Sequence, residues 1–320
     1  MTDGKLILAP MQGLTEVMFR KCYETCFPGA LDYAISPFLS LTHGNLADAW
    51  EKIDDVWPER NKESIPVIPQ ILGKECEEFV ALANRLYEVG YSEVNWNIGC
   101  PVRRVAHKHR GSGILPYPEE IQQILDYVVP RIQPRLSIKM RLGYYAPEEI
   151  FNIIPILNSY PLSCVTIHPR IGKQQYGGQV DLDTLDQVLP LLHHNTIYNG
   201  DIFTAERYRY IRERYPNIKD VMLGRGVLYN PLLPLEIKGI TRHQEFVSTF
   251  ISALISDIET TYPSEQARTR KTKEYWVLLR KSLPVTEQES LLVLHQTNFN
   301  DTKKTIYQLL TKSQEIHNSK

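Results

Sequence analysis

Short apolar runs rich in β-branched residues recur through the first three quarters of the chain, and stretches of helical periodicity separate them. This alternation predicts eight strand–helix units, which close into a parallel (β/α)8 barrel of the TIM type. The strands are expected at Lys5–Ala9, Tyr33–Ser36, Pro66–Leu72, Glu93–Asn97, Leu136–Met140, Cys164–His168, Thr196–Asn199 and Val221–Gly224. Helices are expected at Glu75–Glu88, Pro118–Val129, Ala146–Leu157, Leu182–Leu192 and Ala205–Arg214.

An open, doubly wound sheet would show the same alternation of strands and helices. Its nucleotide-binding fingerprint, Gly-x-Gly-x-x-Gly, should follow the first strand. The sequence there is instead Pro10-Met11-Gln12-Gly13-Leu14-Thr15. The barrel is therefore favoured over the open sheet.

The pattern changes after about Gly239, where helical periodicity continues without strands. We predict a barrel domain over residues 1–240 and an all-α helical bundle over residues 241–320. The helices of this second domain are expected at Glu245–Thr260, Glu265–Leu283, Glu287–His295 and Thr302–Ser313.

Composition places the protein in a broad class. The chain is 42% hydrophobic, its formal net charge is -1, and no long apolar run offers a membrane span. Its first residues lead straight into the first strand without a secretory signal. Five cysteines at irregular spacings favour reduced thiols over a disulfide framework. We expect a soluble, cytoplasmic protein, with a monomer as the default.

Cys100 follows the fourth strand and precedes Pro101, at the end of the barrel where active sites lie. A thiol there can act as a nucleophile or a proton donor, and a buried structural cysteine is the alternative. The loop over residues 102–113 carries four formal positive charges, which suit a phosphate-rich substrate. Cys100, His107 and His109 match no spacing typical of zinc ligands, so no metal is expected.

Polar and glycine-bearing sequences follow other strands at the same end. Asn199-Gly200-Asp201 and Gly224-Arg225-Gly226 follow the last two strands, where barrels commonly bind phosphate through backbone N–H groups. Lys139 and His168 end the fifth and sixth strands, and inward polar groups need a partner such as a flavin. A turn, a surface lysine and a satisfied core histidine are the alternatives.

Taken together, these motifs resemble the bacterial-type, FMN-dependent tRNA-dihydrouridine synthases over about residues 5–240. The family's motifs stand here as Ala9–Gly13, Gln70–Gly73, Asn97–Pro101 and Lys139–Gly143, together with His168, Arg170, Gln174, Tyr176 and Gly178. Asn95, Arg103-Arg104, His109 and Pro169 depart from the family pattern. None of these departures removes a group that the reaction needs.

The resemblance implies that FMN is bound, that NADPH reduces it, and that a D-loop uridine of tRNA is the substrate. Hydride then reaches C6 of the uracil while Cys100, the general acid, protonates C5. The implied cofactor contacts are Pro10, Met11, Gln70, Lys139, His168, Asn199, Gly200, Asp201, Gly224 and Arg225. The implied substrate contacts are Asn97, Arg103, Arg104, Arg141, Arg170 and Tyr176, with Arg268, Arg270, Lys271 and Lys273 in the helical domain.

Two other functions stay open from sequence. One is a non-catalytic tRNA-binding or chaperone protein on the same barrel, against which the intact Cys100, Lys139 and His168 argue. The other is an FMN barrel that reduces a small molecule, such as a dihydroorotate dehydrogenase or an enoate reductase. Such an enzyme does not call for a basic loop after Cys100 together with a locally basic helical domain.

Overall fold

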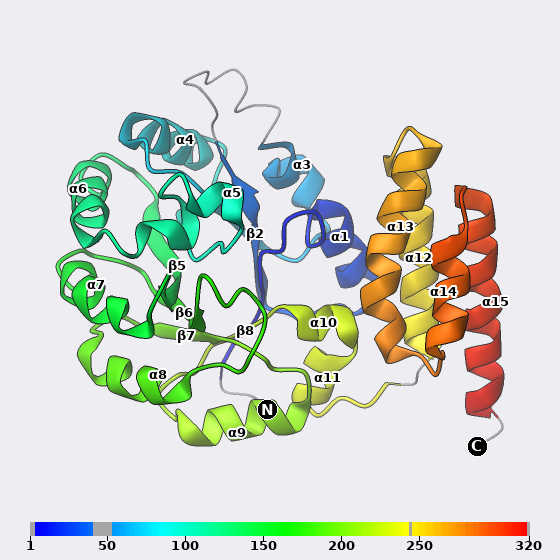
Figure 1. Ribbon diagram of the computed structural model, residues 1–320. Coiled ribbons are helices and arrows are strands. Elements are labelled where there is room, and N and C mark those ends of the chain that lie inside the picture. Colours follow the sequence, from blue (N-terminus) through cyan, green and yellow to red (C-terminus); the bar gives the residue numbers. More distant parts are fainter. Residues whose placement is uncertain (1–3, 41–52, 243–244, 319–320) are drawn as a thin grey trace.

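A computed structural model describes residues 4–40, 53–242 and 245–318 of the chain. Eight parallel strands form a closed barrel in the order β1 to β8, and helices surround it (Figure 1). Pairing of Ile7 on β1 with Met222 on β8 completes the ring. The predicted (β/α)8 fold is confirmed.

All eight predicted strands are present, and several ends differ. The strands are β1 (Leu6–Leu8), β2 (Tyr33–Leu39), β3 (Val67–Ile71), β4 (Glu93–Ile98), β5 (Arg135–Gly143), β6 (Val165–Ile171), β7 (Thr196–Asn199) and β8 (Val221–Leu223). β5 and β6 continue three residues beyond their predicted ends because they pair with each other as far as Gly143 and Ile171. Arg141, His168 and Arg170 therefore lie within strands.

Helices follow the strands on the outside of the barrel, and most begin at a local signal. Pro118 occupies the first turn of α6, and the side chains of Asp181 and Thr204 accept backbone N–H bonds at the starts of α8 and α9. The helices of this part are α1 (Val17–Cys26), α3 (Pro58–Asn61), α4 (Cys76–Glu88), α5 (Arg103–Ala106), α6 (Pro118–Val128), α7 (Ile150–Leu157), α8 (Leu182–Val188), α9 (Ala205–Arg214), α10 (Arg225–Tyr229) and α11 (Leu233–Ile237).

Sequence reasoning missed α1 because charged residues interrupt its apolar face. Arg20 lies on the buried side of this helix and is fully enclosed. Its guanidinium donates to Asp55 Oδ2 at 3.0 Å and to the Thr15 carbonyl at 2.8 Å. A buried arginine is tolerated only with such partners, and the periodicity of the sequence does not reveal them.

Four helices described after α11 form a bundle beside α1 (Figure 1), and the predicted division at residue 240 falls between α11 and α12. They are α12 (Glu245–Thr261), α13 (Glu265–Leu279), α14 (Glu287–His295) and α15 (Phe299–Asn318). Phe19 of α1 packs edge-on against Phe250 at 5.7 Å and stacks with Tyr275 at 5.9 Å between ring centroids. Among the described helices, none has both the length and the apolar character that crossing a membrane requires.

Candidate active site

A cavity of about 390 Å³ opens at the carboxyl end of the barrel, and residues in or just after every strand line it. All ten predicted cofactor contacts lie in its wall, and so does Cys100. Of the predicted substrate contacts, Asn97, Arg104, Arg141 and Tyr176 line it as well. The wall does not include Arg103, Arg170 or the four basic residues of α13.

A chain of buried hydrogen bonds leads from the backbone of Cys100 into the barrel. The Cys100 N–H donates to Asn97 Oδ1 at 2.9 Å, and the Asn97 amide donates to Gln70 Oε1 at 2.7 Å. The Gln70 amide donates to Asn95 Oδ1 at 2.7 Å, and the Asn95 amide donates to Ser137 Oγ at 3.0 Å. Because every donor points the same way, the bonds polarise one another and fix the start of the Cys100 loop.

The loop after Cys100 folds back onto it. The Cys100 carbonyl accepts hydrogen bonds from Ser112 N–H and Ser112 Oγ, both at 2.9 Å. Gly111 has a φ of +57°, and a Cβ there would lie 2.7 Å from the Cys100 oxygen and 2.8 Å from the Cys100 Cβ. Ser112 and Gly111 therefore hold the cysteine from its far side, a role that sequence reasoning did not assign to them.

The Cys100 thiol keeps its proton in this setting. Burial raises its pKa, and the backbone N–H of Val102 and the charges of Arg141, Lys139 and Arg104 offset only part of that effect. All five cysteines are free, as the sequence predicted. A protonated thiol in an active-site cavity is suited to donating a proton.

Two further titratable groups of the cavity are shifted toward their neutral forms. The Lys139 side chain is partly exposed to the cavity, but most of it is enclosed by the barrel. Desolvation and the charge of Arg141 therefore lower its pKa to about 7. Burial, followed by Arg141 and Lys139, lowers the pKa of His168 well below its usual value. Since the Arg170 guanidinium can only donate, its contact with His168 Nε2 at 3.2 Å leaves the imidazole proton on Nδ1.

Two predicted substrate-contacting arginines are engaged by the protein itself. Arg170 is 1% exposed and bonds both oxygens of Asp201 and the carbonyls of Gly177 and Gly178. Asp201 also accepts from Arg225 at 2.9 Å. Arg141 lines the cavity but donates to the carbonyls of Gly99, Ile171 and Gln175. These arginines hold the loops around the cavity in place.

The helical bundle reaches the cavity through α13. Lys271 is buried and donates to the Gly13 carbonyl at 2.5 Å, and Tyr275 donates to the Leu14 carbonyl at 2.6 Å. Both contacts hold the Pro10–Leu14 segment, which forms part of the cavity wall together with Leu278 of α13. The bundle thus braces the first barrel loop, which sequence reasoning did not foresee.

The other basic residues of α13 differ in their surroundings. Lys273 donates to the carbonyls of Leu294 and Gln296 at the end of α14. Arg268 donates to the Tyr262 carbonyl at 2.7 Å. The Arg270 side chain is 77% exposed, and its one ion pair within the described residues is a distant contact, 3.9 Å, with Glu274. Arg270 is therefore the member of this set most available to a partner.

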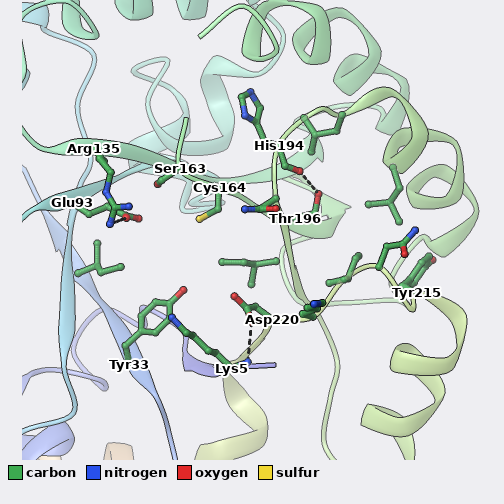
Figure 2. Close-up of a pocket in the computed structure, with 18 of the residues that line it drawn as sticks. Lys5, Tyr33, Glu93, Arg135, Ser163, Cys164, His194, Thr196, Tyr215 and Asp220 are labelled. Carbon is green, nitrogen blue, oxygen red and sulfur yellow. Dashed lines mark hydrogen bonds and ion pairs between the residues drawn. The ribbon is translucent and has the colours of Figure 1, made fainter. Parts of the chain in front are cut away.

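A larger cavity, about 1030 Å³, lies at the opposite end of the barrel (Figure 2). Among its charged residues, Arg135 pairs with Glu93 at 3.2 Å, and the Asp220 carboxylate accepts from the backbone N–H of Lys5 at 2.9 Å. Burial raises the pKa of the Cys164 thiol in its wall to about 12. This end of a barrel ordinarily serves stability, and we assign the chemistry to the carboxyl end.

No group of three or more His, Cys, Asp or Glu side chains within the described ranges is placed to hold a metal ion. His109 instead contacts Glu120 Oε1 at 2.8 Å and stacks on Tyr117. The fold and the cavity together define a (β/α)8-barrel protein with a protonated thiol among cationic groups at its carboxyl face.

The comparisons with known proteins give the family. The sequence model described as Dihydrouridine synthase (Dus) matches residues 7–289. The chain is 30% identical to the tRNA-dihydrouridine synthase B of Pasteurella multocida over 72% of its own length and 68% of that protein. It is 28% identical to the Vibrio cholerae protein of the same name, over 75% and 73%. The chain therefore belongs to the dihydrouridine synthase family.

Solved structures that resemble the chain share its fold at low identity. Histamine dehydrogenase from Rhizobium sp. 4-9 matches with a TM-score of 0.56 at 8% identity, covering 79% of this chain and 49% of that one. Morphinone reductase matches with a TM-score of 0.52 at 15% identity, over 77% and 88%. Both likenesses agree with the barrel architecture.

Replacing Gly111 with alanine should destabilise the protein more than the same change at Gly29. Both glycines have positive φ values, +57° and +67°, but a Cβ at Gly29 meets nothing within 4 Å. Each variant should lose about 1 kcal/mol from backbone strain. Gly111→Ala should lose about 1–3 kcal/mol more, because its Cβ collides with Cys100. Urea unfolding measures the difference, and equal losses would contradict the packing described for this loop.

Proposed function

We propose that this protein is an FMN-dependent tRNA-dihydrouridine synthase that reduces the C5–C6 double bond of a D-loop uridine, with NADPH as reductant and Cys100 as general acid. Family membership supports the reaction, and the relatives named above carry the activity in their names. The observation that carries the role of Cys100 is its place in the cavity wall at the carboxyl face, where partial burial raises the pKa of the thiol and the Asn97–Ser137 chain holds its backbone N–H.

The residues of the cavity suit a flavin phosphate or ring anion. No hydrogen bond or ion pair joins the Lys139 amine to another residue in the described part of the chain. Desolvation lowers the pKa of this amine to about 7. An amine in that position calls for an anionic or acceptor-bearing ligand. Gly200 and Gly224 follow β7 and β8 in the same wall and allow a ligand to approach the backbone closely, and the Arg225 guanidinium lies in that wall as well. When bound, the flavin supplies the hydride.

The protein side of the reaction then consists of positioning and proton delivery. The uridine must leave the RNA stack to enter the cavity. Cys100 donates its proton to C5, and the resulting thiolate lies near the charges of Arg141, Lys139 and Arg104. Neutral His168, with its Nδ1–H free to donate, adds a hydrogen bond donor without adding charge.

The partners follow from the same proposal. Arg104 and Tyr176 line the cavity mouth and are exposed, so they are placed to meet the tRNA as it enters. Arg270 on α13 extends the contact to the helical bundle. We further propose that the enzyme is cytoplasmic and that it acts as a monomer; light scattering of the purified protein tests the monomeric state.

Replacing Cys100 with alanine should lower dihydrouridine formation by at least about 100-fold, because a positioned acid contributes about 10²–10⁴ in rate. Mass spectrometry of digested tRNA, taken from a reaction with NADPH, measures the product. Cys164→Ala is the matched control, since Cys164 lies at the opposite end of the barrel. Full activity of Cys100→Ala would refute the assigned role.

The affinity for FMN should fall as the pH rises above about 7. The Lys139 pKa of about 7 belongs to the free protein, and binding an anion raises it, so the protonated form binds more tightly. Affinity should be constant below that pH, drop by up to about tenfold per pH unit above it, and level off past the bound-state pKa. Quenching of FMN fluorescence between pH 6 and 9 measures this.

Lys139→Gln should bind FMN weakly and without that pH dependence. Lys74→Gln, whose lysine pairs with Glu120 outside the cavity, should retain it. A pH profile of Lys139→Gln identical to that of the wild type would remove Lys139 from the flavin site.

A further inference from the structure

Beside the cavity that Cys100 lines, the carboxyl face of the barrel has a further groove of about 670 Å³, which we call the lateral groove. The two hollows share Pro101, the residue after Cys100. Its walls come from α5 and the loop that follows, from the end of β5 and from the end of β6. The lateral groove thus borders the loop after Cys100 without being part of the cavity that Cys100 lines.

The lateral groove carries positive charge that the protein leaves unpaired. The cations Arg103 and Lys173 line it and are exposed, and the His107 imidazole lies in the same wall and is also exposed. Among the described residues, none forms an ion pair or side-chain hydrogen bond with these three side chains. No carboxylate is found among the described residues that line the groove. Cations gathered without counter-charges are typical of a surface that meets phosphate.

Aromatic rings lie among these cations. Tyr145 is 54% exposed, and the Lys173 amine lies 4.5 Å from the centre of its ring. Tyr144 meets Tyr145 at 81° with ring centres 4.7 Å apart, and Tyr117 stacks on His109 at 4.0 Å. Exposed rings interleaved with cations are the means by which proteins hold unpaired nucleotides, since every base has a face that stacks.

Two close-packed glycines and a hydrogen-bonded loop shape the walls of the lateral groove. A Cβ on Gly113 would lie 2.1 Å from the Ala106 carbonyl, and one on Gly172 would lie 2.3 Å from the Tyr144 ring. The Glu149 carboxylate accepts the N–H groups of Tyr144 and Tyr145, at 2.7 and 3.0 Å. The glycines let the walls approach, and the carboxylate fixes the loop that presents Tyr145.

We propose that the lateral groove binds the RNA strand next to the target uridine, with Arg103 and Lys173 on its phosphates and a neighbouring base stacked on Tyr145. This inference rests on the proposed function, because a uridine inside the cavity stays joined to a strand that must leave past the Cys100 loop. The helical bundle lies beside α1 and α10, while α6, which begins next to Tyr117 of the lateral groove, lies on the far side of the barrel (Figure 1). The RNA is therefore gripped on both sides of the cavity.

The test uses Lys173→Ala and Tyr145→Ala in the full chain and an unmodified tRNA transcript as the probe. Arg131→Ala and Tyr127→Ala are matched controls, because Arg131 lies 4.1 Å over the Tyr127 ring outside the lateral groove. Fluorescence anisotropy gives the dissociation constant over a range of salt concentrations. KM values for tRNA and for NADPH are measured on the same variants.

Lys173→Ala should reduce the slope of log K against log salt by about 0.7–0.9, since one phosphate contact is lost. Tyr145→Ala should weaken tRNA binding by about fivefold or more with the slope unchanged, since only stacking is lost. Both variants should raise KM for tRNA and leave KM for NADPH as it is. The two controls should bind tRNA like the wild type.

The outcomes separate this inference from the proposed function. If the wild type forms dihydrouridine but both lateral-groove variants bind tRNA like the controls, the inference is overturned and the proposed function stands. A rise in KM for NADPH with unchanged tRNA binding also overturns it and assigns the lateral groove to the dinucleotide. If the salt slope falls as predicted but the wild type forms no dihydrouridine, the RNA contact stands and the proposed function fails.

Discussion

The start of the Cys100 loop is anchored in the barrel by a run of hydrogen bonds that leads from the Cys100 N–H through Asn97, Gln70 and Asn95 to Ser137. Leaving one buried member unpaired costs about 1–3 kcal/mol, so the members support one another. The run also explains why Asn95 is accommodated where the family pattern has an acidic residue. An ionised carboxylate can only accept hydrogen bonds. The Asn95 amide instead accepts a hydrogen bond from Gln70 and donates one to Ser137 Oγ. The Ser137 hydroxyl in turn donates to the Val94 carbonyl.

Charge distribution around the loop determines what the cavity can hold. Asp201 is the only carboxylate among the described residues in the cavity wall, and Arg170 and Arg225 share it. Lys139 and Arg104 are left without a counter-charge, and both lie near the Cys100 thiol. The charges of this cavity thus suit the proposed anionic cofactor, and they would stabilise the thiolate that the proposed proton transfer leaves on Cys100. The helical bundle contributes by holding the Pro10–Leu14 wall through Lys271 and Tyr275.

The sequence predicted those features that follow from local patterns. Eight strands were recognisable because each is a short apolar run, and the cavity residues were recognisable because they lie near the carboxyl ends of the predicted strands or just after them. Features that depend on distant contacts were not predictable. The sequence predicted that Lys271 contacts tRNA and that Tyr275 lies on the same helix, facing tRNA or the core. Both side chains instead donate hydrogen bonds to carbonyls of a barrel loop about 260 positions away in the chain. Arg170 resembled a substrate contact, but the strand extends past His168 and buries its side chain against Asp201. The sequence did not reveal the lateral groove, because three separate segments of the chain form it.

The measurement that tests the central claim most directly is the visible spectrum of the purified protein under anaerobic conditions, followed after adding NADPH and then unmodified tRNA. The account predicts an oxidised flavin band that NADPH bleaches and tRNA restores. In Cys100→Ala, NADPH should still bleach the band, but tRNA should fail to restore it, because the proton donor is missing. A colourless protein that cannot take up FMN, or a band that tRNA restores equally without Cys100, would contradict the account.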